Sequence, residues 1–483
     1  MTRHGLSSCP LTQLSVWDAG RLIKARQVSP VELVEACLRQ IEATQPHLFL
    51  YITILADEAL AAARKAEAEI AAGSWKGPLH GVPFAVKDNY HVKGVRTTAG
   101  SRLMLDHVAT DTATIVTRLL DAGAILLGKL NTWEFGTGNG EIHPDLPFPH
   151  ARNPWNEKHF TGGSSTGAGA AVAAGAALFA LGSDTGGSVR LPAAATGVQG
   201  MKATFGLISR AGILPNCWSS DVSGPLTWTT RDSALVLSAI AGSDPFDPYC
   251  VDRRPRDYTA GIDEPVVGIR VGVVRDFGAD APPFQPAVLG NLQRVADVLA
   301  GQGAIVREAR LPAPLSAFRR TLSVINWSEC YSIHETDFLQ NHQLMGRSLR
   351  DKLMSGAMVR AADYLAALRH RATLAKMLDV LMHDYDALIM PTTTITAPNF
   401  SNQDRLVAFT FGATTAIQNV TGHPALSIAS GFDEAGLPTA VQISGRMFDE
   451  PLVYRLAQSW EAVADPRSKR PSSSSITRRS AIQ

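Results

Sequence analysis

One uncharged stretch of small residues constrains this chain more than any other part of its sequence. Residues 160–183 contain no charged side chain, and they include the motif Thr161-Gly-Gly-Ser-Ser-Thr-Gly167. A second motif, Gly182-Ser-Asp-Thr-Gly-Gly-Ser-Val-Arg190, overlaps its end. The alanine-rich segment between the motifs predicts a helix, and the apolar run Leu178–Leu181 predicts a short strand. Because small residues let neighbouring elements approach closely, we expect the two loops, which carry Ser164 and Ser188, to lie side by side.

Two other uses of this stretch are disfavoured. It is long enough for a membrane-spanning helix, but its glycines and hydroxyl residues argue against a continuous lipid-facing helix. A phosphate-binding loop would end in Gly-Lys-Ser/Thr, whereas Ala168 follows Gly167 here. We therefore predict neither membrane insertion nor nucleotide binding.

A lysine upstream completes a set of residues with chemical meaning. Lys87 directly follows Pro83–Val86, an apolar run typical of a buried strand. A serine nucleophile, a second hydroxyl group and a lysine are sufficient for acyl transfer. Lysine acts as a base only when it is neutral, and burial lowers its pKa.

The overall composition narrows the classes of partner. With 45 basic and 44 acidic residues, the chain offers no electrostatic basis for binding nucleic acid or an anionic membrane. The five cysteines are scattered without a CxxC pair, which fits free thiols in a reducing cytoplasm. The thirteen histidines show no HxxxH or HExxH spacing, so we expect no metal site.

Hydrophobic periodicity divides the chain into parts. Residues 11–80 predict helices. In the core at 81–260, the segment 81–130 alternates short apolar runs with helical segments, which predicts βα units and a mainly parallel sheet. Beyond the core, a helix is predicted at 286–302 and a nearly all-helical insertion at about 315–383. Further strands are predicted at Ala124–Leu127, Val266–Val274, Ala304–Ala309, Asp386–Pro391 and Val441–Ser444. The tail at 465–483 is basic and serine-rich, and we expect it to be poorly packed.

Together these motifs resemble those of the amidase signature family. The resemblance covers roughly residues 12–463 and implies one large α/β domain over 1–464, a twisted mixed β-sheet covered by helices on both faces. Thr166 stands where the family usually has glycine, at a position that starts a helix. The matching segments are Gly81–Asn89, Gly162–Gly167, Gly182–Arg190, Asp386–Pro391, Thr421–Ala425 and Gly436–Gly445.

The resemblance also implies a role for each motif residue. Ser188 is the nucleophile, Ser164 a bridging serine preceded by a cis peptide bond, and Lys87 the base. A hydroxyl group donates and accepts hydrogen bonds at once, so Ser164 can pass a proton between the other two. Neither a metal nor an organic cofactor is required. The backbone N–H groups expected to form the oxyanion hole are those of Thr185, Gly186, Gly187 and Ser188.

Two functions remain open. The first is hydrolysis of C–N bonds in hydrophobic or aryl amides, with carbamates (urethanes) as a further class, by a cytoplasmic monomer or homodimer. Trp133, Phe135 and Trp218 are candidates for its substrate wall, and their apolar character argues against a strongly charged substrate. The alternative is a glutaminase-type subunit of a transfer-RNA-dependent amidotransferase, which would depend on a partner. A non-catalytic scaffold is disfavoured because all three triad positions are intact.

Overall fold

The fold is taken from a computed structural model that describes residues 10–142, 144–464 and 469–471. Cys9 and most of the basic tail, 465–468 and 472–483, lie outside the described residues. Within the tail, Arg470 lies over the ring of Trp228, 3.9 Å from its centroid, and donates a hydrogen bond to the Gln13 carbonyl at 3.1 Å.

Eleven strands form one sheet in the order β1-β3-β2-β4-β6-β5-β10-β11-β9-β7-β8. The strands are β1 (Tyr51–Ile54), β2 (Pro83–Lys87), β3 (Ile125–Leu130), β4 (Phe179–Asp184), β5 (Gln199–Lys202), β6 (Val222–Thr227), β7 (Arg270–Val274), β8 (Ile305–Ala309), β9 (Ala387–Pro391), β10 (Ala425–Phe432) and β11 (Pro438–Gly445).

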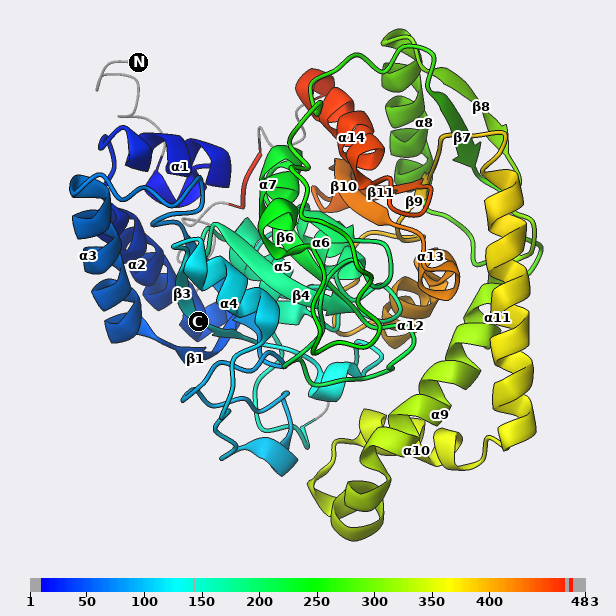
Figure 1. Ribbon diagram of the computed structural model, residues 1–483. Coiled ribbons are helices and arrows are strands. Elements are labelled where there is room, and N and C mark those ends of the chain that lie inside the picture. Colours follow the sequence, from blue (N-terminus) through cyan, green and yellow to red (C-terminus); the bar gives the residue numbers. More distant parts are fainter. Residues whose placement is uncertain (1–9, 143, 465–468, 472–483) are drawn as a thin grey trace.

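Helices cover both faces of the sheet (Figure 1). They are α1 (Val16–Lys24), α2 (Pro30–Leu48), α3 (Ala56–Ala71), α4 (Thr114–Asp121), α5 (Thr166–Ala173), α6 (Arg190–Thr196), α7 (Thr230–Ile240), α8 (Pro286–Gly301), α9 (Leu315–Asn341), α10 (Arg347–Ala357), α11 (Ala361–Leu381), α12 (Gln403–Gly412), α13 (Ala416–Thr421) and α14 (Glu450–Ala464). Short 3-10 helices are η2 (Leu11–Gln13), η3 (Arg102–Met104), η4 (Glu134–Gly136) and η5 (His342–Leu344).

The sheet is mixed, as the family resemblance implied, and the prediction of a mainly parallel sheet is wrong. Strands β3, β2 and β4 run parallel to one another, as do β9, β7 and β8 at the other end. Between them, β4, β6, β5, β10, β11 and β9 pair antiparallel. The short connection between β10 and β11 explains one of these pairs, because parallel neighbours need a long crossover.

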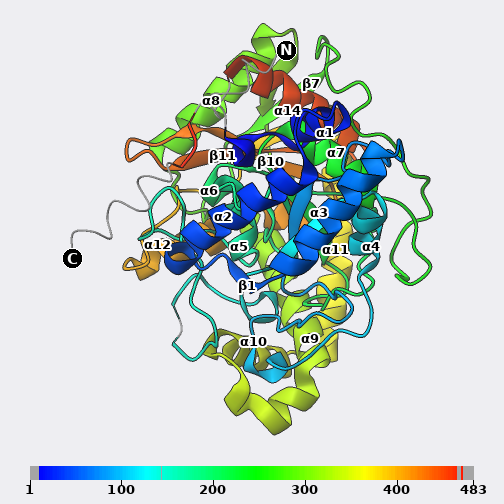
Figure 2. The same cartoon turned by 90° about the vertical axis from the view of Figure 1, so that its left-hand side faces the viewer.

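The N-terminal part, predicted to be helical, also contains a strand. β1 pairs antiparallel with β3 and so extends the sheet by one strand. The helices around it begin where expected: Ser29 and Glu32 form a capping box, and Pro30 occupies the first position of α2. Figure 2 shows α2 and α3 in front of the sheet, where they contact each other and the strands β2 and β3.

The uncharged stretch 160–183 contains the buried helix α5. All of its residues are buried, and it starts at Thr166 as predicted. At Gly167 an added Cβ would lie 2.4 Å from the Leu50 carbonyl oxygen, so this contact requires glycine. The close packing of α5 positions the loop that precedes it, which carries Ser164.

The segment predicted as a helical insertion forms an arm beside the sheet. Helices α10 and α11 both pack against α9, and α9 also contacts α13 (Figure 1). This arm brings residues beyond 315 close to the two serine loops. Across the described residues, no helix is both long and apolar enough to cross a membrane.

Candidate active site

Lys87 ends the buried strand β2 and points at Ser164. Its Nζ lies 2.7 Å from the Ser164 Oγ and 2.9 Å from the Ser183 Oγ, and the lysine is fully buried. Burial lowers the pKa of Lys87 to about 7, although Asp221 and Asp184 act in the opposite direction. A large fraction of Lys87 is therefore neutral near pH 7 and able to accept a proton.

The loop of Ser164 is fitted against Trp133. The Gly163–Ser164 peptide bond is cis, as predicted. The Ser164 carbonyl accepts hydrogen bonds from the Trp133 N–H at 3.1 Å and the Thr132 hydroxyl at 3.2 Å. An added Cβ on Gly163 would lie 2.3 Å from the Trp133 ring, so glycine is needed at this position.

The two serine loops lie side by side, as the sequence predicted. Ser188 lies between β4 and α6, and its carbonyl accepts a hydrogen bond from the Ser165 N–H at 3.3 Å. Gly187 has a φ of 126°, and an added Cβ there would lie 2.4 Å from the Thr415 Oγ1. Thr415 itself donates to the Gly186 carbonyl at 2.7 Å, which joins the loop to the start of α13.

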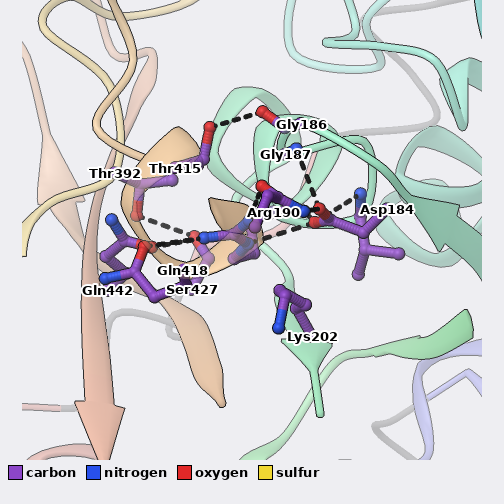
Figure 3. Close-up of polar contacts among 12 residues, drawn as sticks. Asp184, Gly186, Gly187, Arg190, Lys202, Thr392, Thr415, Gln418, Ser427 and Gln442 are labelled. Carbon is purple, nitrogen blue, oxygen red and sulfur yellow. Dashed lines mark hydrogen bonds and ion pairs between the residues drawn. The ribbon is translucent and has the colours of Figure 1, made fainter. Parts of the chain in front are cut away.

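A buried ion pair holds the Ser188 loop in shape (Figure 3). Asp184 and Arg190 flank the loop, are fully buried and form an ion pair at 3.1 Å. Burial alone would raise the pKa of Asp184, but Arg190 and the Asn419 amide outweigh it and lower the pKa to about 2. Arg190 also donates to Gln418 and Gln442. The pair therefore has a structural role in this loop.

The Asp184 carboxylate also reduces the number of N–H groups that are available to form an oxyanion hole. The Gly187 N–H donates to the Asp184 Oδ1 at 2.8 Å, so it is already engaged. This leaves the N–H groups of Thr185, Gly186 and Ser188 as candidates. Thr185 is itself fixed, because its hydroxyl donates to the carboxylate of Asp221 at 2.5 Å.

Ser188 opens onto a cavity of about 510 Å³. The serine loops and Trp133 form one side of it, and helices α9 and α10 form the other. Its wall is more charged than the sequence suggested. The charged residues that line it are Glu141, Arg319, Arg347, Asp351 and Lys352.

Comparison with known proteins identifies the family. A family model described as Amidase matches residues 32–454. The chain belongs to the amidase family. The resemblance to the amidase signature enzymes is thereby confirmed.

Named relatives of this amidase fall into two groups. It is 36% identical over 491 residues to a glutamyl-tRNA(Gln) amidotransferase subunit from Roseiflexus sp. (strain RS-1), covering 95% of this chain and 98% of the relative. It is 36% identical over 486 residues to the protein of the same name from Moorella thermoacetica, covering 95% and 99%. Among solved structures, it resembles the peptide amidase from Stenotrophomonas maltophilia with a TM-score of 0.85 and 30% identity, covering 96% of this chain and 99% of that one. A bacterial aryl acylamidase matches with a TM-score of 0.85 and 26% identity, covering 95% and 98%.

The three residues predicted to line the substrate site of this amidase lie in two different cavities. Trp133 lines the 510 Å³ cavity. Phe135 and Trp218 instead line a small adjoining pocket of about 20 Å³, and the Phe135 ring packs 4.4 Å from that of His334. Phe135 and Trp218 therefore do not line the cavity onto which Ser188 opens. For Phe135 the reason is local, because its φ of 44° in η4 turns the chain between Trp133 and Gly136.

Several site residues of the amidase are not predicted by the sequence. Ser183 bonds to Lys87 and lies inside the second serine motif, which could have revealed it. Arg319 and Lys352 come from the arm, and no motif marks them. No group of three or more potential metal-binding His, Cys, Asp and Glu residues occurs in the described part of the chain.

Proposed function

We propose that this amidase hydrolyses a C–N bond through an acyl-enzyme on Ser188. The Ser188 Oγ attacks the carbonyl carbon while its proton passes through the Ser164 hydroxyl to Lys87. The same proton then returns to the departing nitrogen, and the amine leaves. Water then attacks the acyl-enzyme and gives a proton to the same relay. The bond between the acyl group and the Ser188 Oγ breaks, the carboxylic acid leaves, and Ser188 recovers its proton.

One observation carries this proposal. The buried Lys87 donates to Ser164 at 2.7 Å, directly beside the loop of Ser188. A lysine with a pKa lowered to about 7 exchanges a proton near neutral pH, which the chemistry requires. The N–H groups of Thr185, Gly186 and Ser188 are proposed to stabilise the oxyanion.

For the substrate, we favour a polar amide such as glutamine over a hydrophobic one. The similarity to the two amidotransferase subunits named above supports this choice. The charged wall of the cavity supports it as well, because polar and charged groups there can pair with a polar substrate. In this alternative the chain works as a glutaminase-type subunit together with a partner.

Hydrophobic or aryl amides, with carbamates as a further class, are the second candidate. Trp133 lies in the cavity, and Trp327 and Phe411 line it with 38% and 55% of their surfaces exposed. The similarity to a peptide amidase and an aryl acylamidase supports this class. A carbamate presents the same carbonyl geometry to Ser188 as an amide does.

The test is an assay of the purified chain alone. It is incubated with glutamine, a panel of aryl amides and their carbamate counterparts, and released ammonia and amine are measured. The proposed hydrolysis is supported if any amide is turned over by the wild type and this turnover is lost in Ser188→Ala. Glutamine turnover that requires added partner subunits favours the amidotransferase, whereas anilide turnover by the chain alone favours the second candidate. Undiminished turnover by Ser188→Ala would refute the mechanism.

A further inference from the structure

Arg319 belongs to the same wall as the reacting serine. It lies in the second turn of α9 and lines the cavity together with Ser188. Leu322, three residues further along this helix, approaches the serine loop: an added Cβ on Gly186 would lie 3.6 Å from the Leu322 Cδ2. Residues three apart share one face of a helix, so Arg319 faces the same space.

A second connection places the guanidinium group there independently. The Arg319 Nη2 donates to the Ala413 carbonyl at 3.1 Å. Two residues on, the Thr415 hydroxyl donates to the Gly186 carbonyl at 2.7 Å. The guanidinium and the Ser188 loop are therefore held by the same short segment of chain.

The guanidinium group of Arg319 makes few direct contacts with the described residues. A guanidinium has five N–H donors, and this one bonds to a single carbonyl. Its Nε is buried, and neither a hydrogen-bond acceptor for it nor a carboxylate within ion-pair distance occurs among the described residues. Burial lowers the pKa of Arg319 to about 10, with Asp280 acting in the opposite direction, so the group stays positively charged at neutral pH.

The other two cations of the wall contact described side chains, and of these two only Arg347 has a carboxylate partner. Arg347 pairs with Asp351 at 3.6 Å. Lys352 donates to the Asn216 Oδ1 at 2.5 Å and to the Thr137 hydroxyl at 3.2 Å. Glu141 is the remaining carboxylate in the wall. Arg319 is half-buried, and a cation that is partly removed from water without a counter-ion is unfavourable unless a ligand supplies one.

We propose that Arg319 binds a carboxylate group of the substrate, so that this chain prefers amides that carry a free carboxylate. The inference rests on the proposed hydrolysis at Ser188 and names the substrate class of that site. A guanidinium group binds a carboxylate with better geometry than an ammonium group does, because two of its planar N–H donors can each bond to one carboxylate oxygen.

The first test is the substrate preference, measured as kcat/KM for glutaryl 4-nitroanilide divided by kcat/KM for its methyl ester. We expect the wild type to prefer the carboxylate, and Arg319→Gln to lower this ratio by about 10- to 100-fold, the range for a hydrogen bond to a charged group. Arg319→Lys retains the charge and part of the preference. The control is Arg320→Gln, since Arg320 is the exposed neighbour on α9 and its loss leaves the ratio unchanged. A wild-type ratio near one, or an unchanged ratio in Arg319→Gln, would overturn the inference.

The second test does not depend on turnover. Ser188→Ala protein is titrated calorimetrically with the same two anilides, with and without Arg319→Gln. The inference is supported if the acid binds more tightly than the methyl ester and Arg319→Gln abolishes this difference. This result would support the carboxylate site even if no amide is hydrolysed, and only the proposed hydrolysis would then be refuted. Equal binding of acid and methyl ester refutes the inference. If the anilide bond of the methyl ester is nevertheless cleaved in a reaction that requires Ser188, the proposed hydrolysis is still supported.

Discussion

Lys87 is the residue whose protonation state governs the proposed reaction. Because its pKa is lowered to about 7, it is protonated and inactive as a base below that pH and neutral above it. We expect kcat/KM to rise about tenfold per pH unit below pH 7 and to level off above it. Lys87→Ala should lower kcat by about 100- to 10,000-fold, whereas the exposed Lys93→Ala should not. A rate that is flat between pH 6 and 8 would contradict this role.

Gly163 is a second residue with a specific requirement. A methyl group there meets the Trp133 ring at 2.3 Å, so Gly163→Ala must displace either the indole or the Ser164 loop. We expect a loss of about 1–3 kcal/mol in the free energy of unfolding, together with reduced turnover. Gly290→Ala in α8 is the control, because an added Cβ there meets nothing within 4 Å. Urea denaturation of both variants measures the difference, and equal stabilities would show that the packing argument fails.

At the scale of elements, the turn from β4 into α6 depends on Asp184 and Arg190. Arg190→Met leaves the Asp184 carboxylate buried without its cation, which should lower the free energy of unfolding by about 3–5 kcal/mol. Arg39→Met provides the comparison, because Arg39 pairs with Glu35 on the surface with 67% and 48% of the side chains exposed. Such pairs contribute little. Urea denaturation that gives the two variants similar stabilities would contradict the account of this turn.

The elements also show what the sequence can predict. Strands β2, β3 and β4 begin with apolar runs next to motifs, and their predicted starts lie within one residue of the observed ones, whereas β3 and β4 continue three residues past the predicted ends through segments that contain polar residues. β6 contains Ser223, Gly224 and Pro225, so its sequence resembles a loop, and it forms a strand only because its neighbours pair with it. The serine loops are predictable because motif and site coincide. Arg319 is not, because only tertiary packing brings α9 to the serine loops.

At the scale of the whole molecule, the cavity depends on how the helical arm joins the core. Glu134, next to Trp133, accepts hydrogen bonds from the Ser101 hydroxyl at 2.6 Å and from the Gly346 N–H, just before α10, at 2.8 Å. Burial raises the pKa of Glu134 to about 7. Glu134→Ala removes both contacts and should cost about 1–3 kcal/mol, with faster amide hydrogen exchange in α10. Unchanged exchange there would mean that other contacts hold the arm.

The most direct test of the central claim is covalent labelling of the nucleophile. A fluorophosphonate probe reacts when a serine Oγ bonds to phosphorus and fluoride leaves, so it needs no knowledge of the natural substrate. Peptide mapping by mass spectrometry should find one label per chain, on Ser188, formed more slowly in Lys87→Ala and absent in Ser188→Ala. Labelling of a different residue, or undiminished labelling of the Ser188→Ala protein, would contradict the assignment of Ser188 as the nucleophile.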